Sequence, residues 1–111
     1  MKQFEVVVEQ PAWEDIERYY QRAVDAGAGL AAARWYNRLV AAILRLEVAA
    51  DARGSIPEQD EFSERLHQMV FERRYRVIYT IVGQRVHVLC VRGSGMRELR
   101  PGRLEWPDSN D

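Results

Sequence analysis

Phe4, Val6 and Val8 alternate with other residues at the start of the chain, so they share one side of an extended backbone. A period of two predicts a β-strand with one buried face. From Pro11 onward the spacing becomes helical, since proline suits a first helical turn and apolar residues then recur every three or four positions. We expect a helix over residues 12–26, with an apolar stripe formed by Trp13, Ile16, Tyr20 and Val24.

A second helix is predicted over residues 30–50. The Gly27-Ala28-Gly29 sequence can end the first helix with a left-handed residue. The second run is rich in good helix formers, and its apolar stripe consists of Leu39, Ile43, Leu46 and Ala50. Because the link between the two runs is short, the helices should be antiparallel neighbours.

Three strands of similar length are predicted after a long loop. Residues 51–63 combine glycine, serine and proline with acidic side chains, which argues against a regular element there. The runs 64–71, 75–82 and 85–91 are strand-like, and the short links between them suit hairpins. The order is therefore β-α-α-β-β-β, an α+β fold in which one sheet packs on a two-helix hairpin. We assign residues 1–104 to a single domain and residues 105–111 to a C-terminal tail.

Residues 75–82 form the middle one of the three predicted strands, and side-chain alternation assigns its residues to the two faces of the sheet. One set is predicted to face the helices: Tyr75, Val77, Tyr79 and Ile81. The other set, Arg76, Ile78 and Thr80, should face solvent or a partner. Several polar residues could flank Arg76 on the adjacent strands: Arg65, His67, Gln68, His87 and Cys90. The plainer alternative is an arginine whose methylene stem covers apolar sheet surface.

The charge composition is almost balanced but its basic residues are unusual. The 111 residues include 16 basic and 17 acidic side chains, for a formal net charge of -1, so no long-range basic field attracts nucleic acid. Every basic residue except Lys2 is arginine, whose planar fork suits phosphate and carboxylate groups. The alternative explanation for the excess of arginine over lysine is codon usage in a GC-rich genome. The arginines include two groups that could meet at one sheet edge: Arg73, Arg74 and Arg76, and Arg92, Arg97, Arg100 and Arg103.

Few residues are available for metal or thiol chemistry. Cys90 is the only cysteine, and His67 and His87 show no metal-ligand spacing, so we expect no metal and no cofactor. Cys90 lies within a VHVLCV run and is predicted to be a buried apolar residue, and strand parity would point His87 away from it. The chain also lacks a signal-peptide pattern and a long apolar run, which favours a cytoplasmic protein without membrane contacts.

Aromatic residues concentrate on the predicted helical hairpin. The adjacent pairs Tyr19-Tyr20 and Trp35-Tyr36 cannot all face inward on one stripe, so at least two of these rings should be exposed or half-exposed. Exposed rings beside Arg34 and Arg38 would form a protein-interaction face, where aromatic and arginine anchors are enriched.

The order of elements and the run RRYRVIYTIVGQRVHVLCVRG resemble the RelE/ParE toxin superfamily of bacterial type II toxin-antitoxin systems, also called plasmid stabilization proteins. The resemblance spans about residues 4–100. It implies a growth inhibitor that is neutralised by a cognate antitoxin, a partly disordered segment of which wraps the toxin. In this superfamily, RelE-like members cleave messenger RNA on the ribosome without a metal, whereas ParE-like members inhibit DNA gyrase.

The resemblance places Arg76 at the strand arginine of the ribonuclease branch and Arg97 within one place of its downstream arginine. His67 is then the only candidate base on the Arg76 face, because the region just before the three predicted strands contains no lysine and no tyrosine or histidine follows His87. We therefore favour a ParE-like toxin that binds a protein such as DNA gyrase over an enzyme. The alternatives are a ribosome-dependent messenger RNA endoribonuclease and a non-toxic relative that only binds its antitoxin. We expect no direct DNA binding without the antitoxin, and antitoxin or target contacts at Arg74, Arg76, Arg92, Arg97, Arg100, Trp35 and Tyr36.

Overall fold

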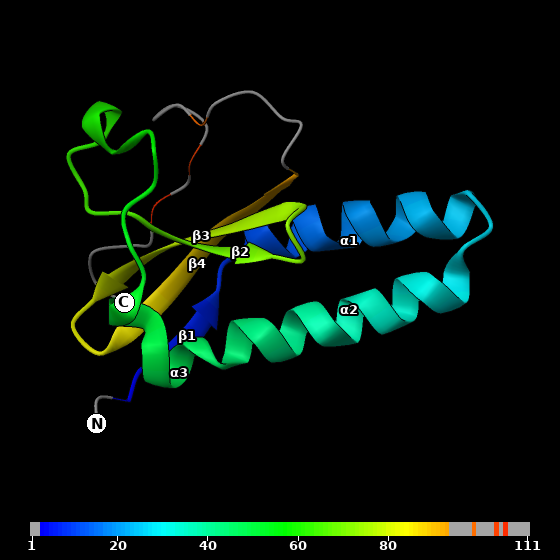
Figure 1. Cartoon of the computed structure of the whole chain (residues 1–111), viewed down its shortest axis with the longest axis horizontal. Helices are drawn as coiled ribbons and strands as arrows, with labels where there is room; N and C mark the ends of the chain where they lie inside the picture. The colour runs from blue at the N-terminus through cyan, green and yellow to red at the C-terminus, as the bar shows by residue number, and fades with distance from the viewer. Residues whose placement is uncertain (1–2, 94–98, 100–103, 105, 107–111) are drawn as a thin grey trace.

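The computed structural model describes residues 3–93 together with Leu99, Leu104 and Trp106. A helical hairpin packs against one face of a four-stranded sheet (Figure 1). Along the chain the main elements are β1 (Glu5–Val8), α1 (Gln10–Asp25), α2 (Gly29–Leu44), α3 (Leu46–Ala49), β2 (His67–Phe71), β3 (Tyr75–Val82) and β4 (Arg85–Gly93). In space the strands follow the order β1-β4-β3-β2, with β1 parallel to β4 and the other pairs antiparallel. The α+β prediction and its element order are confirmed.

The two long helices form the predicted hairpin, and Gly27 lies between them with a φ of 86°, which glycine adopts without strain. The helix predicted over 30–50 is interrupted, because α2 ends at Leu44 and α3 follows as a separate short helix. The interruption lies where β1 docks: the Phe4 N–H donates to the Glu47 carbonyl oxygen at 2.6 Å. Helix propensity carries no signal for such a tertiary contact.

The inner core lies between the hairpin and the sheet. The predicted stripe of α2 and α3 is buried there, with exposed fractions of 0–2% for Leu39, Ile43, Leu46 and Ala50. Val77 and Tyr79 meet this stripe from β3, as predicted from side-chain alternation. The Tyr79 hydroxyl donates to the Ala50 carbonyl oxygen at 2.6 Å, which satisfies a polar group that has no access to water.

The opposite face of the sheet is not open to solvent, contrary to the prediction for Ile78 and Thr80. Ile78 is fully buried and Thr80 is 7% exposed. They lie beneath residues 53–66, and the Thr80 hydroxyl donates to the Arg65 carbonyl oxygen. A second apolar group, here called the outer cluster, fills this layer: Ile56, Phe62, Leu66, Ile78, Leu89, Cys90, Leu99 and Leu104.

The loop that covers the outer face is more ordered than predicted. It contains two short 3-10 turns, over Ala50–Ala52 and Gln59–Glu61. The Gln59 side chain donates to the Glu64 carbonyl oxygen and accepts from the Leu66 N–H, so it links the second turn to the start of β2. Apolar side chains from this loop bury the outer face of the sheet, and Trp106 lies edge-on to Phe62 with ring centroids 6.4 Å apart.

A β-bulge in β4 changes which residues share a face. Ile78 pairs with Cys90 whereas Tyr79 pairs with Val88, so Leu89 is an extra residue in the ladder. Leu89 and Cys90 consequently both contact the outer cluster. The predicted separation of His87 from Cys90 by strand parity is therefore wrong, because parity inverts across a bulge and both residues belong to the outer face.

Helix α1 supplies the hydrogen-bond acceptors that β1 does not provide to β4. β1 pairs only with residues 85–88 of β4. Beyond that point the Val91 N–H donates to Asp15 Oδ2 at 3.0 Å and the Gly93 N–H donates to the Tyr19 hydroxyl at 2.8 Å. Two side chains one helical turn apart thus satisfy two N–H groups on the edge of β4 that β1 leaves unpaired, which hinders the addition of a further strand there.

Candidate functional site

Arg76 lies on the outer face of the sheet, as predicted, but its guanidinium group is bound within the protein. Nη1 and Nη2 donate to the two carboxylate oxygens of Glu58 at 2.9 and 2.6 Å, and Nε donates to Gln68 Oε1 at 2.9 Å. The side chains of Arg76 and Glu58 are only 20% and 6% exposed. Gln68 is therefore the one predicted flanking residue whose side chain bonds to Arg76 among the described residues.

Glu58 connects three separate segments of the chain. Its carboxylate lies in the covering loop, binds Arg76 on β3 and accepts the Leu99 N–H at 2.9 Å. The hydrogen bonds from Arg76 lower the pKa of Glu58 from its usual 4.5 to about 2, against the opposing effect of burial and with a smaller contribution from Leu99. The group is therefore ionised at any physiological pH, and the ion pair with Arg76 is permanent.

His67 lies on the opposite face from Arg76, so the prediction that it shares the Arg76 face is wrong. In the β2–β3 register Arg76 is opposite Val70, whereas His67 is opposite Tyr79. The His67 ring stacks on Tyr79 with centroids 5.3 Å apart, and its Nδ1 is hydrogen-bonded to the Arg53 carbonyl oxygen. A base and an arginine on opposite faces of one sheet cannot act on the same phosphate.

Cys90 is buried in the outer cluster, as predicted. Burial raises the pKa of its thiol from 9.0 to about 12, so the thiol is protonated at neutral pH and is a poor nucleophile. His87 is hydrogen-bonded through Nδ1 to Glu9 Oε1 at 2.8 Å. Among the described residues, no cluster of three or more His, Cys, Asp and Glu side chains could hold a metal ion.

Two predicted site residues meet at the end of the sheet near the β2–β3 turn. Trp35 and Arg74 both line a cavity between this turn and the helical hairpin, here called the aromatic hollow. Tyr19 and Tyr75 complete its aromatic wall. The remaining lining residues are small or charged: Ala23, Ala28, Ala31, Ala32, Arg38 and Glu72.

The three rings of the aromatic hollow contact one another. The Tyr75 ring lies 5.2 Å from both Tyr19 and Trp35, centroid to centroid, in tilted or edge-to-face geometry. The Arg22 guanidinium lies 5.9 Å from the Tyr19 ring centroid. Trp35 Nε1 is buried without a hydrogen-bond partner in the described part of the chain. Half-buried rings with a basic rim are typical of the anchor sites of protein interfaces.

The turn beside the aromatic hollow is strained. Glu72 and Arg73 have φ values of 51° and 61°, and non-glycine residues in this left-handed region cost of order 1 kcal/mol each. Arg38 on α2 holds the turn from outside, with its Nε and Nη2 donating to the Glu72 carboxylate at 2.6 and 3.3 Å. These hydrogen bonds lower the pKa of Glu72 and raise that of Arg38. Strained turns of this kind concentrate at functional sites.

Sequence comparison identifies the family. Residues 6–98 match the model described as the ParE toxin of type II toxin-antitoxin systems, parDE. The chain belongs to the ParE toxin family. A chain in the solved structure of a chromosomal ParDE toxin-antitoxin system from P. aeruginosa has the same fold, with a TM-score of 0.70 and 15% identity over 82% of this chain and 96% of that chain. No curated protein matches the sequence at a significant level.

Membership of the ParE family confirms the resemblance to the RelE/ParE superfamily and its ParE-like branch. As the toxin of a parDE system, this ParE protein has a ParD-type antitoxin as its cognate partner. No helix in the part of the chain that the structure describes is long and apolar enough to span a membrane.

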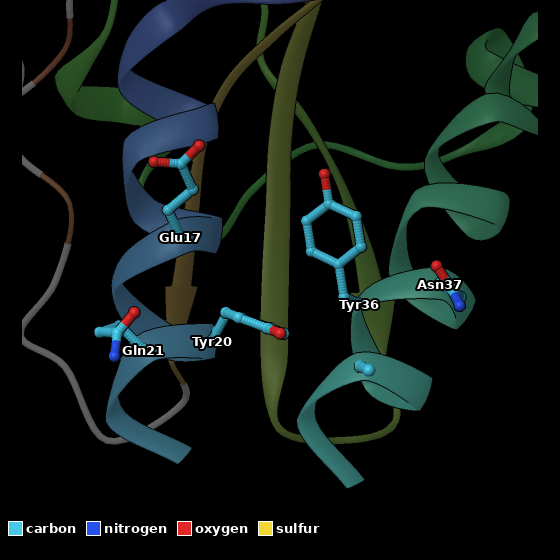
Figure 2. A pocket seen from close by; sticks show the side chains of 6 residues that line it. Glu17, Tyr20, Gln21, Tyr36 and Asn37 are labelled. Atoms are coloured by element: carbon cyan, nitrogen blue, oxygen red, sulfur yellow. The ribbon is translucent and has the colours of Figure 1, made fainter. Parts of the chain in front are cut away.

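The predicted contact residues of this ParE toxin are divided among separate surfaces. Trp35 and Arg74 line the aromatic hollow, whereas Arg76 and Arg92 are cross-strand neighbours on β3 and β4. Tyr36 lies in a different cavity between α1 and α2, here called the hairpin groove (Figure 2). Arg97 and Arg100 are outside the described residues. No local pattern marks Glu72 as the partner of Arg38, since they are 34 positions apart.

Proposed function

We propose that this ParE toxin inhibits growth by binding DNA gyrase and that it does not cleave messenger RNA. The observation that carries the proposal is the state of Arg76, the residue that the ribonuclease alternative requires. All three of its guanidinium nitrogens donate to Glu58 or Gln68. The charge of this arginine is neutralised by a buried carboxylate, so it has little positive charge and few free N–H donors to stabilise a phosphorane transition state.

The lack of a suitable proton acceptor near Arg76 also supports the proposal. Metal-free cleavage needs a group that takes a proton and a group that returns one. Of the two histidines, His67 is on the other face, and His87 is 4% exposed and bonded to Glu9. Burial raises the pKa of the Tyr79 hydroxyl, like that of the Cys90 thiol, to about 12. Neither group is a general base near neutral pH.

A protein-binding toxin needs an anchor surface, and the aromatic hollow is suited to that role. It combines three half-buried rings with a basic rim at Arg74. Neither Arg73 nor Arg74 forms an ion pair with a residue of the described chain, so both are available to acidic side chains of a partner. We place the contact with gyrase at this hollow. The antitoxin would neutralise the toxin by covering the same surface.

The test uses the purified toxin in two parallel assays. In the first, gyrase supercoils relaxed plasmid with ATP, and in the second, ribosomes translate a defined messenger RNA. The proposal predicts loss of supercoiling and intact messenger RNA. Arg74→Ala and Trp35→Ala should each weaken gyrase inhibition by about tenfold or more, as truncation of an interface anchor does. Arg45→Ala is the control, because Arg45 is exposed between α2 and α3, outside the aromatic hollow.

Two outcomes would contradict the proposal. Messenger RNA that is cut by the wild-type protein but not by the folded double variant Glu58→Gln, Arg76→Met, which leaves no unpaired buried charge, would establish the ribonuclease alternative. No effect in either assay, together with normal growth of cells that express the protein, would establish the non-toxic, antitoxin-binding relative.

A further inference from the structure

The hairpin groove lies between the two long helices, and its composition differs from that of the aromatic hollow. Helix α1 contributes Glu17, Tyr20 and Gln21, and α2 contributes Ala33, Tyr36 and Asn37. Each set has the same spacing, i, i+3 and i+4, so each set lies on one face of its helix. Figure 2 shows the side chains of Tyr20 and Tyr36 extending into the space between the helices. The small side chain of Ala33 leaves part of that space unfilled.

The two tyrosine rings form a corner. Their centroids are 5.9 Å apart and their planes are inclined by 72°. Trp13 stacks on Tyr36 with a centroid distance of 6.4 Å and an angle of 29°, which supports Tyr36 in this orientation. The face of an aromatic ring is electron-rich, so a corner of two rings attracts a cation.

The charge of the hairpin groove is also negative. Glu17 is the only charged residue among those that line it, and it forms no ion pair or hydrogen bond with any other described residue. Its neighbours on α1 are already engaged: Arg18 donates to Asp15 at 3.0 Å and Gln21 donates to Asp25 at 2.9 Å. An unpaired, exposed carboxylate therefore lies beside two half-buried tyrosine rings.

We propose that the hairpin groove binds an arginine side chain of the cognate antitoxin. A guanidinium group is planar, so it can stack on a tyrosine ring while its fork donates to the Glu17 carboxylate. A lysine ammonium offers the charge without the planar stacking. An acidic side chain would be repelled by Glu17. The choice of the antitoxin rests on membership of the ParE family, which supplies that partner, and not on the gyrase proposal.

The hairpin groove differs from the aromatic hollow in its position and in the sign of its charge. Tyr19 and Trp35 belong to the hollow, whereas their immediate neighbours Tyr20 and Tyr36 belong to the groove. Adjacent helical residues point about 100° apart, so the two aromatic pairs serve different surfaces of one hairpin. The hollow has a basic rim and selects acidic side chains, and the groove selects a cation.

The probe for this site is N-acetyl-L-arginine amide, titrated into the isotope-labelled toxin and followed by NMR. Saturable shifts are expected at the backbone amides of Tyr20, Tyr36 and Asn37. The citrulline analogue has the same shape but no charge, and it should bind at least about tenfold more weakly, as the loss of ~1.4 kcal/mol implies. Equal binding of the two analogues, or no saturable shift with the arginine analogue, would overturn the proposal.

Variants locate the site and identify its occupant. Glu17→Gln should weaken probe binding while the fold is kept, because Glu17 is exposed, and Tyr36→Leu should also weaken it. Glu47→Gln, at an exposed position on α3, is the matched control and should bind the probe like the wild type. The toxin–antitoxin complex should not bind the probe, since the antitoxin arginine already fills the groove. If the complex binds the probe as tightly as the free toxin does, the antitoxin does not occupy the hairpin groove and the proposal is overturned.

Discussion

Glu58 and Arg76 form a bidentate ion pair beneath the loop that covers the outer face of the sheet, with N–O distances of 2.6 and 2.9 Å. The pair joins the covering loop to the start of β3, and the Leu99 N–H adds a third segment to the same carboxylate. The pair bears on the function proposed for this ParE toxin, because the ribonuclease alternative requires an available Arg76 and all three guanidinium nitrogens of Arg76 donate within the protein. The energetic cost of disturbing it is therefore the first quantity to measure.

Replacing Glu58 by glutamine should destabilise the protein by about 3 kcal/mol, because a buried guanidinium group then lacks its counter-charge. The measurement is the free energy of unfolding from a urea titration. Adding Arg76→Met to Glu58→Gln should restore most of the loss, since the second substitution removes the unpaired charge. If Glu58→Gln alone lowers the unfolding free energy by less than about 1 kcal/mol, as an exposed ion pair would, the pair is not structural.

The same carboxylate should produce acid sensitivity. The pKa of Glu58 is about 2 in the folded protein and 4.5 when unperturbed. A group whose folded pKa is depressed contributes stability above its unfolded pKa and loses it as the pH falls through the folded pKa. The contribution of Glu58 should therefore be complete above about pH 4.5 and disappear towards pH 2. Subtracting the unfolding free energies of Glu58→Gln from those of the wild type, pH by pH, should give a curve that falls in this window, and a flat difference would be inconsistent with the ion pair.

The contacts of α1 with β4 make a separate prediction for hydrogen exchange. Tyr19→Phe removes the hydroxyl that accepts the Gly93 N–H, so exchange at Gly93 should accelerate while exchange at Val91, held by Asp15, changes little. The Asp15→Ala variant should show the converse. The loss of one such hydrogen bond should lower the unfolding free energy by about 1 kcal/mol. Unchanged exchange at Gly93 in Tyr19→Phe would mean that the hydroxyl does not protect it.

Relieving the strain of the β2–β3 turn should stabilise the protein. Arg73 has a φ of 61°, so Arg73→Gly should raise the unfolding free energy by up to about 1 kcal/mol. Arg74 follows in the same turn but does not have a positive φ. Arg74→Gly should therefore lower the unfolding free energy. The comparison of the two melting temperatures checks the sign. A loss of stability in Arg73→Gly would show that the Arg73 side chain stabilises the fold by more than the strain of its positive φ destabilises it.

Much of the fold follows from short-range patterns. Residues 75–82 were predicted as a strand with the same limits that β3 has, because alternation and the flanking turns define both of its ends. The stripe from Leu39 to Ala50 is buried as predicted, since helical spacing survives the interruption between α2 and α3. Patterns of this kind reflect the local geometry of one element.

The outer face of the sheet could not be predicted in the same way. The bulge at Leu89 is a property of pairing with β3 and has no signature in the sequence of β4 alone. Glu58 and Arg76 are 18 positions apart, and only the fold of the covering loop brings them together. The sequence predicts half-exposed aromatic rings on the hairpin, and the four rings are half-buried. Their division between the aromatic hollow and the hairpin groove depends on Tyr75, which reaches the hollow from the sheet.

Growth inhibition by the double variant Glu58→Gln, Arg76→Met tests the central claim most directly. The variant removes the arginine that a ribonuclease requires, leaves no unpaired buried charge and keeps an acceptor for the Leu99 N–H. Its fold and its binding to the antitoxin are checked with the purified protein, and growth is measured after induction without the antitoxin. A toxin that acts through protein contacts should still arrest growth at the wild-type level of expression. A folded, antitoxin-binding double variant that no longer arrests growth would contradict the account.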